Sequence, residues 1–194
     1  CMGVRGELTG KYLETLGFAE GRDFMVIGCP SMYMKGKRLH IQNPKLDVNS
    51  KVCFNSNVAA SVPTRKFIKL KMKEFENHYF IGQVVNELRS IYLGAPYEYK
   101  IEYNFRNVTD KIYQDGRLRF FCNVPKWMEF LNDSDLTFGS RLHGNIAAVL
   151  AGTPALLVTK DSRTRELAEY HHLNAIHESK LNEKLTLQEL VEQQ

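Results

Sequence analysis

The sequence is poor in cysteine, and the few cysteines it has are widely spaced. Its 194 residues include four, which form no Cys-x-x-Cys pair: Cys1, Cys29, Cys53 and Cys122. This spacing argues against a zinc ribbon, and so low a count argues against a small disulfide-stapled fold. Three of the four fall in apolar, strand-like runs, so we expect buried free thiols in a reducing cytoplasm.

Long apolar runs and a large excess of one charge are also missing. No stretch approaches the roughly 20 apolar residues of a membrane span, and no signal peptide is recognisable. The 26 basic and 22 acidic residues give a formal net charge of +4. The densest basic cluster is interleaved with apolar residues, so we interpret it as a solvated helix face rather than a nucleic-acid site: Arg65, Lys66, Lys69, Lys71 and Lys73. We therefore expect a cytoplasmic protein without an integral membrane segment.

What the sequence does have is the composition of a globular domain. Hydrophobic residues make up 43% of the chain, and a chain of this length buries about 70% of the surface that its unfolded form exposes. The chain opens at Cys1 and enters a dense motif, Val4 to Thr9, with almost no lead-in. We therefore expect a single domain over residues 1–194, the C-terminal half of a larger protein whose N-terminal domain is absent.

Short apolar runs alternate with helical patterns, most regularly in the last third of the chain. Strands are predicted at 24–28, 51–58, 78–85, 119–122, 136–139 and 155–159, and helices at 9–16, 64–77, 125–131, 142–151 and 163–170. Residues 92–116 lack a clear period and are predicted to be irregular, with one short helix near 108–114. Strands that alternate with helices form βαβ units. The predicted fold class is therefore α/β: a Rossmann-like three-layer domain with a mostly parallel sheet.

The segment 135–144 carries the strongest local signal. Ligands of parallel sheets bind beyond the carboxyl ends of the strands. Here Gly139 and Ser140 end a predicted strand, while Arg141 and His143 open the next helix. The free amides of a helix start, together with a guanidinium, favour an anion such as phosphate or carboxylate, and a histidine can exchange a proton near neutral pH. The sequence therefore predicts an anion pocket at this loop.

These polar residues also have a structural interpretation. Arg141 could pair with a carboxylate such as Asp135 while His143 caps a neighbouring carbonyl group. Gln83 and Glu87, at the end of another predicted strand, could bond to a ligand or complete the edge of the core. The residues alone leave these alternatives open.

Two strings near the ends of the chain resemble a known family. FGSRLHGNIAAVLAGTPALLVTKDSRTREL, from Phe138, is similar to the C-terminal signature of polysaccharide pyruvyl transferases. VRGELTGKYLETLG, from Val4, is similar to the block that opens their second domain. The order of strands and helices between these strings is similar as well. The resemblance implies one half of an enzyme with two Rossmann-like domains, similar in shape to the GT-B glycosyltransferases.

The resemblance also implies an activity. Such an enzyme transfers a pyruvyl group from phosphoenolpyruvate to two sugar hydroxyls and makes a cyclic ketal in exopolysaccharide or cell-surface glycan biosynthesis. It implies no cofactor and no metal. The acceptor would be a glycan or a lipid-linked saccharide, which would bring a cytoplasmic enzyme to the inner face of the membrane. The missing N-terminal domain would supply much of the acceptor pocket.

The same resemblance assigns roles to residues. Arg141 and His143 match the family's Arg-x-His pair, so His143 and Arg141 are the predicted catalytic residues, and Arg5 matches another donor-contacting arginine. Two guanidiniums can neutralise a phosphate and a carboxylate, while a histidine can move protons. The predicted donor-binding set includes the neighbouring loop and helix residues: Arg5, Gly139, Ser140, Arg141, Gly144 and Arg163. For the segment around Arg163, the alternative is that Asp161 simply caps the helix.

Two other functions stay open. A nucleotide-sugar-dependent GT-B-type glycosyltransferase would also use a helix start to bind a diphosphate, although no clear ribose-binding carboxylate follows the 139–144 loop. A non-catalytic glycan-assembly module would need neither the arginine nor the histidine of that loop, so their presence argues against it.

Overall fold

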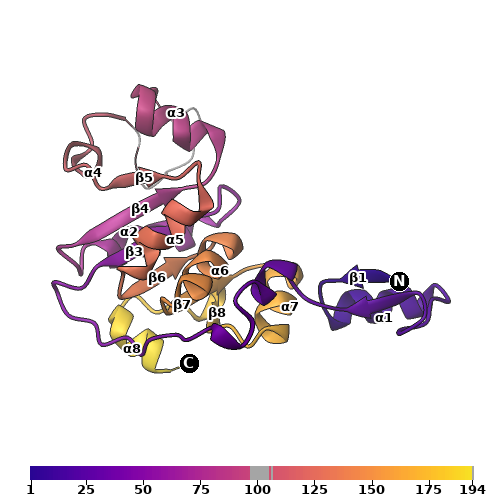
Figure 1. Ribbon diagram of the computed structural model, residues 1–194. Coiled ribbons are helices and arrows are strands. Elements are labelled where there is room, and N and C mark those ends of the chain that lie inside the picture. Colours follow the sequence, from indigo (N-terminus) through magenta and orange to yellow (C-terminus); the bar gives the residue numbers. More distant parts are fainter. Residues whose placement is uncertain (97–104, 106, 194) are drawn as a thin grey trace.

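The protein, seen in a computed structural model, is built around a six-stranded parallel sheet (Figure 1). The structure describes residues 1–96, 105 and 107–193. In spatial order the strands are β5 (Leu118–Phe120), β4 (His78–Gly82), β3 (Val52–Asn55), β6 (Leu136–Gly139), β7 (Ala155–Thr159) and β8 (Ala175–His177). Counted from β3, this is the 3-2-1-4-5-6 order of doubly wound nucleotide-binding folds. The predicted α/β, Rossmann-like fold with a mostly parallel sheet is confirmed.

Helices cover both faces of this sheet. On one face, α2 (Val62–Met72) and α8 (Leu187–Glu192) pack over the fully buried rings of Phe54, Phe80 and Phe138. On the other face lie α5 (Val124–Asn132), α6 (Leu142–Ala151) and α7 (Ser162–Tyr170). Each buried phenylalanine stabilises the fold by about 1.5–3 kcal/mol. The sheet edge at β5 lies toward α3 (Val85–Leu93) and α4 (Lys111–Gln114) (Figure 1).

The first 26 residues form a smaller unit beside α7 (Figure 1). Its strands β1 (Met2–Val4) and β2 (Phe24–Val26) pair in parallel in a sheet of their own, and α1 (Glu7–Thr15) connects them. The Tyr170 hydroxyl at the end of α7 donates to the Val26 carbonyl at 2.9 Å. His171 Nε2 accepts a hydrogen bond from the Cys29 amide at 2.6 Å. The unit is thus fastened to the end of α7, while the single domain over 1–194 stays a prediction.

Some elements differ from the sequence predictions. β4 ends at Gly82 rather than 85, because Glu87 folds back to accept a hydrogen bond from the Val84 amide at 2.9 Å and so starts the unpredicted helix α3. The short elements β8 and α8 are also additions. The expected irregular segment 92–116 lies partly outside the described residues. Within it, α4 falls inside the range predicted for a short helix.

The cysteines are less uniformly buried than expected. Cys53 in β3 is fully buried, and burial raises the pKa of its thiol to about 11. This thiol therefore stays protonated and unreactive. All four cysteines are free thiols, but Cys1 and Cys122 are exposed and Cys29 is partly exposed. The expectation of buried thiols is wrong for Cys122, which follows an edge strand of the sheet.

The basic cluster on α2 is not uniformly solvated either. Arg65 and Lys71 are only 4% and 2% exposed. Arg65 donates to carbonyl groups of the loop before α2. Lys71 Nζ donates to Glu74 Oε1 at 2.7 Å and to the carbonyl oxygens of Glu183 and Leu185. The predicted solvated face is therefore wrong for these two residues, whose long side chains reach backbone acceptors that need donors.

The contacts of Lys71 predict a large effect of its removal. Lys71→Met leaves Glu74 and the carbonyl groups before α8 without their donor, so we expect a loss of about 3 kcal/mol in the free energy of unfolding. Lys69→Met, an exposed position on the same helix, should change it by less than about 0.5 kcal/mol. Urea unfolding of both variants measures the difference. Equal effects would show that the buried amine contributes nothing specific.

Candidate active site

The candidate site lies where the strand order of the sheet reverses. β3 and β6 are neighbours at this point, with Asn55 paired opposite Gly139, yet the chain leaves them toward opposite halves of the sheet. In doubly wound folds, this divergence opens a crevice beyond the carboxyl ends of the strands, and ligands bind there. The loop 139–144, predicted as an anion pocket, lies at this crevice.

Close packing of the backbone fixes this loop. A Cβ atom on Gly139 would lie 2.0 Å from the Asn55 carbonyl oxygen, so only glycine fits. The Asn55 side chain then accepts a hydrogen bond from the Arg141 amide at 2.8 Å, and Ser140 Oγ accepts one from the Asn57 amide at 2.9 Å. Gly144 is less constrained, because a Cβ there would lie 2.5 Å from Gln83 Nε2, the end of a flexible side chain. These contacts explain the residue types on packing alone, and donor binding by this loop stays a prediction.

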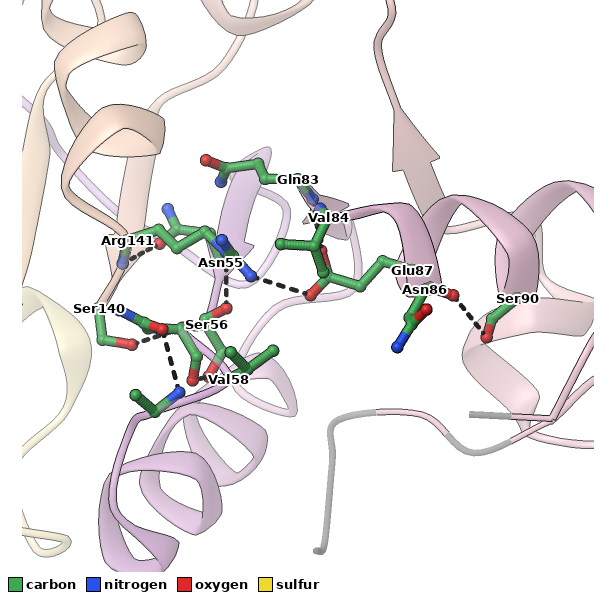
Figure 2. A network of polar contacts seen from close by, with 12 residues as sticks. Asn55, Ser56, Val58, Gln83, Val84, Asn86, Glu87, Ser90, Ser140 and Arg141 are labelled. Atoms are coloured by element: carbon green, nitrogen blue, oxygen red, sulfur yellow. Dashed lines mark hydrogen bonds and ion pairs between the residues drawn. The ribbon is translucent and has the colours of Figure 1, made fainter. Parts of the chain in front are cut away.

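The Arg141 guanidinium turns inward, between Ser56 and Glu87 (Figure 2). Its Nε donates to the Ser56 carbonyl at 2.9 Å, and its Nη2 lies 3.5 Å from Glu87 Oε1. The Glu87 side chain is fully buried, and its other oxygen accepts hydrogen bonds from the amides of Gln83 and Val84. The permanent charge of Arg141 therefore compensates a buried carboxylate.

This ion pair agrees with the structural interpretation in that Arg141 pairs with a carboxylate, although that carboxylate is not Asp135. Asp135, the partner considered for Arg141, instead accepts a hydrogen bond from the Lys51 amide at 2.7 Å. The partner is Glu87, which comes from the half of the sheet on the other side of β3. Three buried polar atoms close to this pair have no hydrogen-bond partner among the described residues: Gln83 Nε2, Arg141 Nη2 and Asn145 Oδ1. Unsatisfied buried atoms are rare in proteins and mark places where a ligand or water completes the bonding.

His143 lies in a different environment from Arg141. It is exposed, in the first turn of α6. Partial desolvation lowers the pKa of its imidazole, and the positive charges of Arg5 and Arg163 lower it further. Arg5 lies in the turn between β1 and α1, and Arg163 lies in the first turn of α7. Two other elements therefore place positive charges near enough to act on the imidazole at the start of α6.

The predicted site residues thus fall into two groups. Arg5, His143 and Arg163 are exposed, and the positive charges of the two arginines act on the histidine; we call these three residues the outer cluster. The remaining predicted residues are mostly buried and hold the loop in shape: Gly139, Ser140, Arg141 and Gly144. Roles in donor binding or catalysis stay predictions for both groups, and the outer cluster is the part open to a ligand.

Sequence reasoning missed Lys160 at the same edge of the sheet. Lys160 follows β7, donates to the Ala59 carbonyl at 3.0 Å and lines a small pocket of about 30 Å³ together with Ser140. Its position in the sequence could have indicated it, because Lys160 directly follows a predicted strand and belongs to the same loop as Arg163. The capping alternative for the neighbouring Asp161 is right: its side chain accepts a hydrogen bond from the Thr164 amide at 2.8 Å. This bond is the main cause that lowers the pKa of Asp161.

The described residues contain neither a group of side chains that could hold a metal ion nor a helix that could span a membrane. Among the described residues, no group of three or more His, Cys, Asp or Glu side chains is placed to hold a metal ion. Over the same part of the chain, no helix combines the length and apolar character needed to cross a membrane.

Comparison with known proteins places the chain in a family. A crystal structure titled as the glycotransferase of kitacinnamycin is similar over 90% of this chain, with 13% sequence identity and a TM-score of 0.45. This chain covers 41% of that one, less than half of its length. None of the curated proteins is significantly similar to the chain. The family model for polysaccharide pyruvyl transferase matches residues 2–162. Since this match runs from β1 to the start of α7, the chain belongs to the polysaccharide pyruvyl transferase family.

Proposed function

We propose that this chain is the donor-binding part of a transferase that moves a pyruvyl group from phosphoenolpyruvate to two sugar hydroxyls. The product would be a cyclic ketal on an exopolysaccharide or another cell-surface glycan. The observation that carries the proposal is the outer cluster, in which the charges of two exposed arginines act on a histidine that opens the helix after β6, at the edge of the sheet where such folds bind ligands.

The charge of the outer cluster suits phosphoenolpyruvate. The donor carries a phosphate and a carboxylate, and Arg5 and Arg163 offer two guanidiniums, each able to form a bidentate pair. Without an anion, their charges disfavour a proton on His143 and lower its pKa. A bound dianion reverses this effect, so donor binding and protonation of His143 support each other.

The reaction needs protons at two stages. A proton goes to the methylene carbon of the donor, and one sugar hydroxyl attacks the adjacent carbon and loses its own proton. The second hydroxyl then attacks the same carbon, the bond from that carbon to the phosphate oxygen breaks, and phosphate leaves with the second proton. In this proposal His143 exchanges these protons, as an acid when the donor holds it protonated and as a base afterwards.

Arg141 would act beneath this cluster. Its Nε and Nη2 atoms face Ser56 and Glu87, so its first effect is to hold the loop that carries Ser140 and His143. A direct contact between Arg141 and the donor, or between the donor and Gly139, Ser140 or Gly144, remains a prediction. The unsatisfied Gln83 Nε2 atom supports a polar ligand near this loop.

We also propose that an N-terminal domain packs against the β1–α1–β2 unit and supplies much of the pocket for the acceptor, a glycan or a lipid-linked saccharide. Leu8 and Tyr12 on α1 and Leu16 at its C-cap recur every four residues and are 55%, 64% and 56% exposed. Met25 on β2 is 51% exposed. Parallel strands are normally covered on both faces, so this apolar surface is typical of an interface. The four free thiols favour a cytoplasmic location for such an enzyme.

Donor binding should be visible in the titration of His143. We expect phosphoenolpyruvate to raise the pKa of His143, which lies below the ordinary value of 6.5 in its absence. Affinity should increase as the pH falls through this pKa, because the protonated imidazole attracts the donor. NMR titration of the full chain measures both. A UDP-sugar that binds tightly where phosphoenolpyruvate does not would favour the glycosyltransferase alternative.

Arg163 should contribute to donor affinity. Arg163→Gln removes a guanidinium from the outer cluster, so we expect about a tenfold weaker Kd for phosphoenolpyruvate, or ~1.4 kcal/mol. Arg165→Gln provides a matched control, because Arg165 lies on the same helix, is exposed and pairs with Glu169. Isothermal titration calorimetry compares the two. Equal affinities in both variants would remove Arg163 from the proposed site.

His143 should be needed for chemistry. His143→Ala removes the proton-transferring group, so we expect a loss of about 10²–10⁴ in kcat for pyruvylation by the complete enzyme. His40→Ala changes an exposed histidine in a distant loop and should leave kcat unchanged. Release of phosphate and formation of the ketal are measured together. An unchanged kcat in His143→Ala would end the acid/base assignment.

A further inference from the structure

The side chain of Glu166 is buried between α7 and the β1–α1–β2 unit. Glu166 is 8% exposed. Its Oε1 atom accepts a hydrogen bond from the Thr9 amide at 2.8 Å, and its Oε2 atom accepts one from the Thr9 hydroxyl at 3.3 Å. Glu166 therefore bonds to an element more than one hundred and fifty residues earlier in the chain rather than to its own helix.

These bonds complete the start of α1. The N-cap of α1 is Gly6, which has no side chain to accept a hydrogen bond from the free amides of the first turn. The Glu166 carboxylate takes this role from outside the helix. It also places a negative charge at the positive end of the helix dipole, which is favourable and accounts for a carboxylate at so buried a position.

The fit around Gly6 is so close that any larger residue would displace the Glu166 side chain. A Cβ atom on Gly6 would lie 2.0 Å from Glu166 Cγ and 2.4 Å from its Cδ. Gly6 itself is buried, and Arg5 immediately precedes it. The backbone that carries Arg5 is thus pressed directly against the Glu166 side chain.

A second contact on the same face of α7 holds the other end of the unit. Tyr170 lies one turn after Glu166, and its hydroxyl donates to the Val26 carbonyl at the end of β2. Residues four apart share a helix face. α7 therefore contacts both the start of α1 and the end of β2. These two contacts restrict the movement of the turn at Arg5.

We propose that Glu166 is a positioning residue that docks the start of α1 on α7 and so holds Arg5 beside Arg163 and His143. Its catalytic meaning rests on the proposed function, whereas the placement of Arg5 does not. α7 would then contribute to the outer cluster in two ways. Arg163, in the first turn of α7, supplies one cation, and Glu166, three residues later, fixes the other.

The pKa of His143 in the full chain, measured by NMR, tests this placement. Loss of Arg5 from the cluster removes a positive neighbour and raises this pKa, whereas loss of the Glu166 charge alone cannot raise it. We therefore expect Glu166→Ala to raise the pKa of His143 to the value found in Arg5→Gln. Gly6→Ala keeps both charged residues but displaces Glu166, so it should act in the same direction.

Two further variants separate position from charge. Glu166→Gln retains an acceptor for the Thr9 amide, so it should keep Arg5 in place and raise the pKa of His143 much less than Glu166→Ala does. Glu169→Ala changes an exposed carboxylate on the same helix and should leave the pKa unchanged. If Glu166→Ala does not fold, Gly6→Ala and Glu166→Gln carry the comparison, and unfolding is evident from collapsed amide dispersion.

The outcomes distinguish this inference from the proposed function. An unaltered pKa in Glu166→Ala and Gly6→Ala, with a raised pKa in Arg5→Gln, would overturn the positioning role, because Glu166 would then only stabilise the fold. No shift in Arg5→Gln would overturn it as well. If the parent chain fails to bind phosphoenolpyruvate, the donor proposal fails while the titration still reports on Glu166. If the donor binds, Glu166→Ala should weaken binding as much as Arg5→Gln does.

Discussion

The parallel pairing of β3 with β6 is the constraint on which the site depends. It brings Asn55 so close to Gly139 that a single methyl group would not fit between them. Because the two strands send the chain in opposite directions, their loops end side by side without a covering connection. Asn55 then fixes the amide of Arg141, and the direction of α6 follows. The position of His143 is therefore a consequence of strand pairing several residues away.

At this edge of the sheet, the buried pair of Arg141 and Glu87 is distinct from the exposed charges of the outer cluster. A buried carboxylate left without its cation costs about 3–5 kcal/mol, so the contact between them ties the two halves of the sheet together. The positive charge of Arg141 thus compensates the internal charge of Glu87. The positive charges that act on the exposed His143 and help to lower its pKa come from Arg5 and Arg163.

Much of this architecture could be predicted from the sequence, because local patterns determine it. Buried runs such as 155–159 and the strand-loop-helix motif at 135–151 need only their own residues to be recognised. Long-range partners could not be predicted. Glu87 starts its own helix with one oxygen and meets Arg141 with the other, and Glu166 caps α1 rather than α7. The likeness to a known family indicated Arg5 as a donor contact, but no local pattern indicates which helix holds it.

A site assembled from separate units has a different physical basis from one formed by a single loop. The start of α6, with its backbone amides and His143, is formed by the folded sheet alone. Arg5 reaches this place only when the β1–α1–β2 unit is docked on α7. Two guanidiniums held near an imidazole repel its proton, and an anion that pairs with both removes this repulsion. The anion that best meets both demands is compact and doubly charged. In the proposed function, protonation of His143 and binding of such a ligand are one coupled event, which depends on how firmly α7 holds the turn at Arg5.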